Sequence, residues 1–370
     1  MKRKLSALLL ALTLFVSLAA VPARAADSPA VLSPQSFAVD GKPVQAEVYN
    51  IGGSNYFKLR DIAMLLKDTD ARFSVDYNEA ARTIELTTGK AYVPNGSELK
   101  TGVDNSATCV ESNQRLLVDG INADLKAYNI GGSNFFRLRD LGEVLRFFVG
   151  YDAETNTALL NSAYYIERID YSEGLPISLY YEIPIFRGSS DALRMIEEEA
   201  EARRAEFAEG QALNALEYTL EGLEGSYPPS PTDPYLAEWD AMVFTCNDDI
   251  VSYGVSYSWY VGGVYDYGIN CYNYDAKTGA HVYLTDVCSG TEDEIKESII
   301  AALLDQYPGV EEAGVMGTPM DVIRDMDVHL IGFYVEDGIV HVTFSKYEIA
   351  FGAAGAFDVE LGAAEPVTKG

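Results

Sequence analysis

The sequence YNIGGSNYFKLRD, at residues 49–61, returns as YNIGGSNFFRLRD at residues 128–140. The two copies are 79 positions apart and differ only by exchanges of Tyr for Phe and of Lys for Arg. One chain rarely needs the same catalytic site twice, whereas a structural unit is often repeated along a sequence. We therefore interpret the phrase as part of a repeated structural module.

The same predicted elements flank both copies. An Asp-Gly pair beginning at Asp40 or Asp119 indicates a β-hairpin before the phrase. Leu59, Ile62 and Leu66 have the spacing of one helix face. A strand, a polar turn and a second strand follow the helix. We expect each repeat to close a small core of its own, with the helix packed on short antiparallel strands.

The residues shared by the two copies are interpreted as structural. The glycines turn the chain because glycine adopts positive φ readily, and the asparagines are expected to cap a helix start. Adjacent Arg and Asp do not face each other on a helix, so each is expected to make an ion pair or a hydrogen bond to the adjacent turn. These positions are Gly52, Gly53, Asn55, Arg60 and Asp61, and then Gly131, Gly132, Asn134, Arg139 and Asp140.

The phrase resembles the identifying core of a stalk-like repeat of secreted Gram-positive bacterial proteins, a family named for similarity to the copper amine oxidase N-terminal domain. The resemblance covers about residues 36–162 and implies an extracytoplasmic stalk or envelope-binding role. Copper amine oxidase activity belongs to another domain, which needs three His ligands. His281, His329 and His341 lie outside the repeats, so we expect no copper, no other metal and no cofactor.

The first residues predict export. Three basic residues precede an almost unbroken apolar run from Ala7 to Val21, and Ala23-Arg24-Ala25 ends it, which is typical of a secretory signal peptide. The apolar run of about 15 residues is short of the ~20 needed to span a bilayer. We expect a secreted, extracellular protein, free or attached to the cell wall, with no membrane span after signal removal.

The rest of the chain is long enough for two or three domains. We place a signal peptide at 1–25, the first stalk-like repeat at 34–92, a linker at 93–114, the second repeat at 115–162, a C-terminal domain at 163–362 and a tail at 363–370. The predicted fold class is α+β. Two small repeats precede a larger α+β domain with a mainly antiparallel sheet.

In the C-terminal domain, residues 251–261 alternate between large apolar and small side chains, which predicts a half-buried strand. Residues 265–271 form its partner. A one-residue slip would move every side chain to the other face of the sheet. We therefore expect an odd-numbered loop about Gly262, which pairs Trp259 with Tyr265.

Export permits disulfide bonds. Cys246, Cys271 and Cys288 lie close together in the C-terminal half. We expect a bridge among these three, with Cys109 left free. No Cys or His spacing is typical of a zinc site.

Three segments of the C-terminal domain carry a second resemblance: YYEIPIF at 180–186, NYDAKTGAHVYLTDV at 273–287 and FYVEDGIVHVTFSKYEIAFGAAG at 333–355. They resemble the extracytoplasmic domain of unknown function shared by a lysozyme-sensing anti-sigma factor and a peptidoglycan deacetylase of Gram-positive bacteria. The resemblance covers roughly residues 164–362. Phe351 and Gly352 depart from the usual Pro and Tyr, and Val264-Tyr265 from the common Ala-His, so ligand binding by those positions does not transfer.

No catalytic, nucleotide-binding or metalloprotease motif occurs, and we expect no catalytic residue. Aromatic rings are the remaining candidates, because they stack on glycans and anchor protein partners. The candidate ligand-binding residues are Tyr260, Tyr272 and Tyr274, which the expected register exposes, together with Tyr347 and Glu348. For Glu348 we favour a structural role in capping the following turn.

The net charge of −29, from 27 basic and 56 acidic residues, excludes nucleic acid as a natural partner and favours a cationic one. We expect a non-enzymatic cell-envelope protein whose stalk repeats display a C-terminal domain that binds cell-wall polysaccharide or a surface partner. One alternative is capture of a cationic protein such as lysozyme. The other is a carboxylate-dependent hydrolase, which converging carboxylates of perturbed pKa in a cleft would support.

Overall fold

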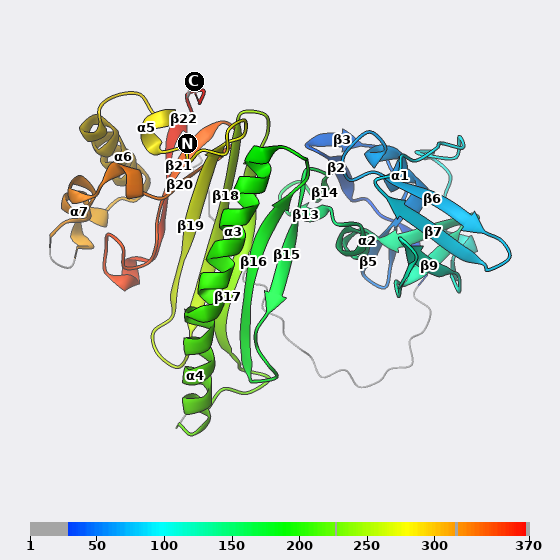
Figure 1. Ribbon diagram of the computed structural model, residues 1–370, viewed down its shortest axis with the longest axis horizontal. Coiled ribbons are helices and arrows are strands. Elements are labelled where there is room, and N and C mark those ends of the chain that lie inside the picture. Colours follow the sequence, from blue (N-terminus) through cyan, green and yellow to red (C-terminus); the bar gives the residue numbers. More distant parts are fainter. Residues whose placement is uncertain (1–28, 226–227, 315–316, 368–370) are drawn as a thin grey trace. The chain divides into compact units, whose positions relative to one another are not determined.

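The computed structural model describes residues 29–225, 228–314 and 317–367 (Figure 1). The predicted signal peptide, residues 1–25, lies outside the described residues. The chain divides into an N-terminal unit, with residues 29–166 and 185–188, and a C-terminal unit that contains the other described residues. The sheets are mainly antiparallel, and the predicted α+β fold class is confirmed.

The central sheet of the N-terminal unit joins the two copies of the repeated phrase. Its strands, in spatial order, are β1 (Val31–Leu32), β4 (Val48–Ile51), β5 (Ser54–Lys58), β12 (Ser133–Arg137), β11 (Ala127–Ile130) and β8 (Val110–Glu111). Each phrase is a β-hairpin that continues into a helix. The two hairpins lie side by side, with Phe57 of β5 opposite Phe136 of β12.

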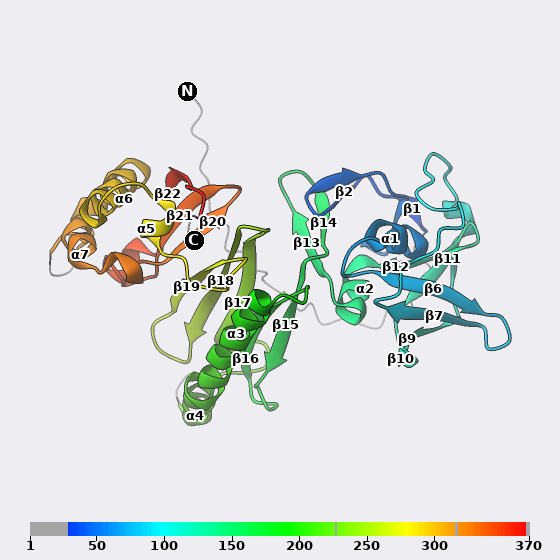
Figure 2. The ribbon, with the colours of Figure 1, turned by 45° about the horizontal axis from the view of Figure 1, so that its top comes forward.

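Two further sheets are made by exchange between the repeats. One contains β13 (Phe148–Asp152), β14 (Thr157–Asn161), β2 (Ser36–Val39) and β3 (Lys42–Val44). The other contains β10 (Ile121–Ala123), β9 (Arg115–Val118), β7 (Thr83–Thr88) and β6 (Phe73–Asn78), which Figure 2 shows side by side. In each sheet the last hairpin of one repeat pairs with the first hairpin of the other, through the parallel pairs β14–β2 and β7–β9.

The repeats therefore share one hydrophobic core. Helices α1 (Leu59–Leu66) and α2 (Leu138–Leu145) contribute Ile62 and Leu141 to the same buried cluster, which also holds Phe37 of β2 and Leu160 of β14. Our expectation that each repeat closes a core of its own is wrong. A unit of about 50 residues buries little apolar surface and is only marginally stable alone, and the exchange of hairpins enlarges the buried core.

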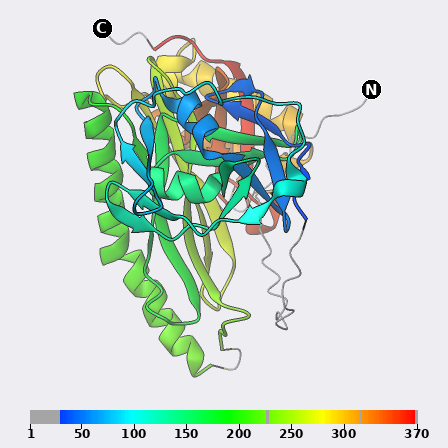
Figure 3. The same cartoon turned by 90° about the vertical axis from the view of Figure 1, so that its right-hand side faces the viewer.

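The C-terminal unit is built on a five-stranded sheet. Its strands, in order, are β15 (Tyr164–Asp170), β16 (Ile177–Phe186), β17 (Tyr235–Cys246), β18 (Ile250–Tyr260) and β19 (Asp266–Asp275). Helices α3 (Asp191–Glu209) and α4 (Gln211–Leu223) run along one face of this sheet (Figure 3). Phe207 of α3 packs on Tyr181 and Trp239, with ring centroids 5.0 and 4.5 Å away.

A second layer packs against β17, β18 and β19 on the opposite face of the same sheet. It consists of β20 (Phe333–Glu336), β21 (Ile339–Phe344), β22 (Phe357–Ala363), α5 (Leu284–Val287), α6 (Glu292–Gln306) and α7 (Pro319–Asp325). Short 3-10 helices are η1 (Ser106–Thr108) in the N-terminal unit, and η2 (Val310–Glu312), η3 (Val328–Leu330) and η4 (Gly352–Ala354) here. The backbone N–H of Val335 donates to Ser252 Oγ at 2.9 Å, which ties the layer to β18.

The register of the β18–β19 hairpin differs from our prediction. Trp259 lies opposite Asp266 and Tyr257 opposite Gly268, so the loop is even-numbered. We assumed that one face of the hairpin is exposed to solvent, but other parts of the protein pack on both faces. Ser252 is fully buried under the second layer, and a side chain at Gly268 would collide with Ser345. The small residues of these strands therefore mark close approach of a second layer rather than contact with water.

The predicted disulfide bridge is absent, because Cys246, Cys271 and Cys288 are separate thiols. Cys246 ends β17 and Cys271 lies in β19, with β18 between them. Two strand spacings alone separate their Cα atoms by about 9–10 Å. A disulfide needs roughly 4.4–6.8 Å. Cys271 instead contacts Thr343 Oγ1 at 3.6 Å.

Candidate functional site

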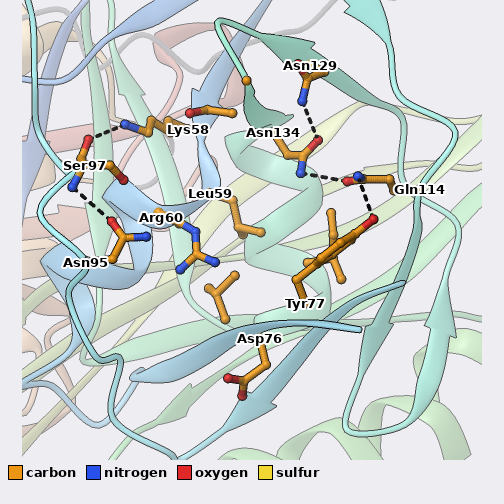
Figure 4. A pocket seen from close by; sticks show the side chains of 14 residues that line it. Lys58, Leu59, Arg60, Asp76, Tyr77, Asn95, Ser97, Gln114, Asn129 and Asn134 are labelled. Carbon is orange, nitrogen blue, oxygen red and sulfur yellow. Dashed lines mark hydrogen bonds between the residues drawn. The ribbon is translucent and has the colours of Figure 1, made fainter. Parts of the chain in front are cut away.

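A polar cavity of about 400 Å³ opens where the two repeats meet in the N-terminal unit (Figure 4). We call it the seam pocket. The first repeat supplies the end of β5, the start of α1 and parts of β6 and β7, and the second supplies the turn between β11 and β12. The remaining lining residues, Asn95, Ser97 and Gln114, come from the segment between the repeats.

A chain of side-chain amides forms one wall of the seam pocket. Asn129 Nδ2 donates to Asn134 Oδ1 at 3.5 Å, and Asn134 Nδ2 donates to Gln114 Oε1 at 2.9 Å. Gln114 Nε2 then donates to Tyr77 Oη at 3.4 Å, as Figure 4 shows. These amides are thus held in fixed orientations and present their remaining polar atoms to the cavity.

The first repeat contains the same amide chain, 79 positions earlier, made by Asn50, Asn55 and Gln35. This explains the two asparagines of the repeated phrase. We expected Asn55 and Asn134 to cap helices, but both lie in strands, and neither α1 nor α2 has a side-chain cap bond. Their role is to join the two arms of each hairpin.

The two copies of the repeated phrase share an Arg-Asp pair, but the contacts of these residues differ between the copies. Arg60 Nη1 donates to Tyr92 Oη at 3.0 Å, and Asp61 Oδ1 accepts from the backbone N–H of Leu99 at 2.9 Å. Both bonds hold residues 92–99 against α1, so they reach beyond the adjacent turn that we expected. In the second copy Asp140 instead pairs with Arg137 at 2.7 Å.

Asp61 is a buried anion beside the seam pocket. It is 1% exposed, and its Oδ2 has no hydrogen-bond partner among the residues that the structure describes. Lys58 Nζ lies 3.5 Å from Asp61 Oδ1 and donates to the backbone carbonyl of Ser97 at 2.6 Å. Burial raises the pKa of the Asp61 carboxyl. Lys58 and Asp61 together fix the pocket wall at residues 97–99.

The pocket combines an aromatic ring with hydrogen-bonding groups. Tyr77 is 44% exposed and lies beside Val75 and Ile84, which are buried. In Figure 4 the Tyr77 ring and the Arg60 guanidinium lie on different sides of the cavity. A ring face with oriented amides and a guanidinium suits a flat, hydroxyl-rich ligand, because such a ligand offers both an apolar face and polar edges.

The candidate residues taken from the sequence lie elsewhere, in the C-terminal unit. Tyr260 is 37% exposed, but Tyr274 is fully buried. Tyr272 and Tyr274 lie on the helix-covered face, where the Arg203 guanidinium sits 3.9 Å from the Tyr272 ring centroid and 3.0 Å from Tyr274 Oη. The expected exposure of Tyr272 and Tyr274 is therefore wrong, because α3 covers that face.

Tyr347 and Glu348 lie together in the turn after β21, separate from Tyr272 and Tyr274. Glu348 Oε2 accepts from the backbone N–H of Ser345 at 2.6 Å. This bond is structural, but it stabilises the turn that precedes Glu348 and not the following turn that we expected. Tyr347 has a φ of +73°. Its ring occupies the space where Gly352 lacks a side chain, so any larger residue there would collide with it.

One carboxylate cluster was missed in the sequence. Glu182 of β16 and Glu238 and Asp240 of β17 share the sheet face opposite α3. Burial raises the pKa of all three carboxyls, and that of Glu182 rises to about 7, partly through Asp240. In the sequence they are ordinary polar positions of alternating strands, and only the spacing Glu-x-Asp could have signalled a shared face.

Each carboxylate of this cluster has a partner on a neighbouring strand. Glu182 accepts from the backbone N–H of Ala241 at 3.2 Å, and Asp240 accepts from Tyr180 Oη at 2.8 Å. Glu238 accepts from Ser178 Oγ. The carboxylates do not line the seam pocket. The cluster therefore joins β16 to β17.

Among residues 29–225, 228–314 and 317–367, no group of three or more His, Cys, Asp or Glu side chains could hold a metal ion. Over the same residues, no helix has the length and apolar character to cross a bilayer.

Comparison with known proteins gives a likeness to solved structures only. No protein-family model matches the chain, and no curated protein matches it. A DUF3298-family protein from Bacteroides fragilis is 13% identical, with a TM-score of 0.34 over 60% of this chain and 91% of that one. A DUF3298-family protein from Pseudomonas aeruginosa is 17% identical, with a TM-score of 0.35 over 54% and 94%. Both names denote a family of unknown function.

The two aligned aspartates provide a matched test of the pocket wall. Asp61→Ala removes the bond to Leu99 and leaves buried Lys58 unpaired, so we expect a loss of about 3–5 kcal/mol in unfolding free energy. Asp140→Ala removes a partly exposed pair and is expected to cost about 1 kcal/mol or less. Urea unfolding of both variants measures the difference, and equal losses would contradict the structural role of Asp61.

The carboxylate cluster predicts a pH dependence. Because the pKa of Glu182 in the folded protein is about 7, above its ordinary value of 4.5, the folded state gains stability from the protonated carboxyl at low pH. That stability is lost as the pH rises through 7. We expect the melting temperature to fall between pH 5 and pH 8 less steeply in Glu182→Gln than in the wild type. Glu221→Gln, at an exposed position of α4, is the control. Its melting temperature should change with pH as that of the wild type does. The same pH dependence in Glu182→Gln as in the wild type would contradict the prediction.

Proposed function

We propose that the protein is an exported, non-enzymatic binding protein of the cell envelope, and that its N-terminal unit holds a cell-wall glycan in the seam pocket. The observation that carries the proposal is the exposed ring of Tyr77 at the end of the oriented amide chain. Sugar rings stack their C–H faces on aromatic rings, while their hydroxyls need donors and acceptors in fixed directions.

The two-repeat architecture supports a stalk that also binds. Exchange of hairpins ties both repeats into one unit, so the binding site and its support are the same body. The C-terminal domain is then displayed from an anchored base. The resemblance of residues 36–162 to envelope stalk repeats fits this arrangement.

Tyr77→Ala tests the proposal, with Tyr151→Ala as its control. Tyr151 is the aligned tyrosine of the second repeat, is 53% exposed and does not line the seam pocket. In a pull-down on purified peptidoglycan, we expect Tyr77→Ala to bind about tenfold more weakly, since stacking on one ring is worth roughly 1–1.5 kcal/mol. Tyr151→Ala should bind as the wild type does.

Failure of the wild type to bind peptidoglycan would end the glycan proposal. Equal losses in the two variants would place the glycan outside the seam pocket. The net charge of −29 supports capture of a cationic protein as the second candidate function. Titration with lysozyme at low salt, where electrostatic attraction is strongest, distinguishes it, because this candidate requires binding that both tyrosine variants retain.

A further inference from the structure

Helix α4 of the C-terminal unit turns its small residues toward the sheet. Ala212, Ala215 and Thr219 are almost completely buried, and the Tyr235 ring lies against Gly222 so closely that a side chain there would collide with it. The spacing of these four positions is that of one helix face. A surface helix normally buries its large apolar residues, and α4 does not.

The large apolar residues of α4 form a second stripe that is exposed. Leu213, Leu220 and Leu223 are 58%, 54% and 43% exposed, and Leu216 between them is half-buried. Their spacing of three, four and three residues is the a/d pattern by which one helix packs along another. The stripe is about 15 Å long, or roughly three helical turns. We call it the leucine stripe; α4 is labelled in Figure 1.

The leucine stripe leads into a cavity. Leu223 lines a pocket of about 560 Å³, together with Leu175, Pro176, Pro229 and Pro231. If a second helix lies along α4, one of its bulky apolar side chains can enter the recess at Leu223. The recess also contains Asp170 and Ser230, so its lining is mixed. An apolar stripe that ends in a recess is the form of a helix-binding groove.

The charge around the stripe decides which helix fits. Residues 205–224 contain five glutamates and no lysine or arginine. Two copies of α4 packed face to face would bring ten glutamates together, and like charges at such a seam oppose association. A helix with lysine or arginine beside its own apolar stripe would instead pair with those glutamates.

We propose that the leucine stripe of α4 binds a cationic amphipathic helix. This surface lies in the C-terminal unit and does not depend on the glycan proposal for the seam pocket. The leucines supply apolar contact, the recess at Leu223 takes one anchoring side chain, and the glutamates select positive charge.

A designed peptide tests the proposal with the full-length protein. The probe is a labelled peptide of two heptads with leucine at a and d and lysine elsewhere, and fluorescence anisotropy measures its binding. Leu213→Ser combined with Leu220→Ser should weaken binding at least about tenfold, since the two serines remove apolar surface that binding of the peptide would bury. Leu330→Ser, at a position that is 82% exposed elsewhere, should bind as the wild type does.

Two further peptides separate the charge from the stripe. A peptide with glutamate in place of lysine should not bind, and a peptide of the same leucine and lysine content in scrambled order should bind about as weakly as the double variant binds the probe. Equal binding of the probe by the wild type and by the double variant overturns the proposal. The proposal is also overturned if the unliganded wild type is a dimer and the double variant is a monomer, because a second copy would then cover the leucine stripe.

Discussion

The parallel pairing of β2 with β14 and of β7 with β9 is the contact on which the N-terminal unit depends. Each pair joins a strand of one repeat to a strand of the other, and neither repeat can complete its sheets without it. The pairing brings Phe37, Ile62, Leu141 and Leu160 into one buried cluster. It also sets the two central hairpins side by side, which creates the seam pocket. The fold and the candidate site thus have the same origin.

The sequence predicted the local elements of this unit better than their partners. The Asp-Gly hairpins, the two helices and the α+β class are present as expected, because turn residues and apolar spacing act over a few residues. The sequence could not show whether a hairpin pairs within its own repeat or across to the other, since both repeats carry the same pattern. It also concealed β5 and β12, because we expected Asn55 and Asn134 to cap helix starts.

The C-terminal unit shows a second limit of pattern analysis. The alternation of large apolar and small side chains identified strand β18 correctly, but it did not show which elements pack on each face of the strand. The small residue Ser252 meets a second layer formed by residues 333–363, which lie far away in the sequence, whereas Gly254 leaves room for Ile269 and Phe244 of the neighbouring strands. The residues that cover each surface could not be identified from the pattern for Tyr274, which is buried, or for the leucines of α4, which are exposed. Of the candidate site, the repeated asparagines could be found from sequence, whereas Tyr77 and Gln114 required the exchange of hairpins to be known.

The central claim, exchange of hairpins between repeats within one chain, is tested most directly by a cross-link. Ser36 of β2 and Thr157 of β14 are opposite each other in the parallel pair, and cysteine is close in size to both. In the variant with Ser36→Cys and Thr157→Cys, mild oxidation should produce an intramolecular disulfide in the monomer, identified by mass spectrometry of the linked peptides. Failure to form this link, or its formation only between two chains, would contradict the account.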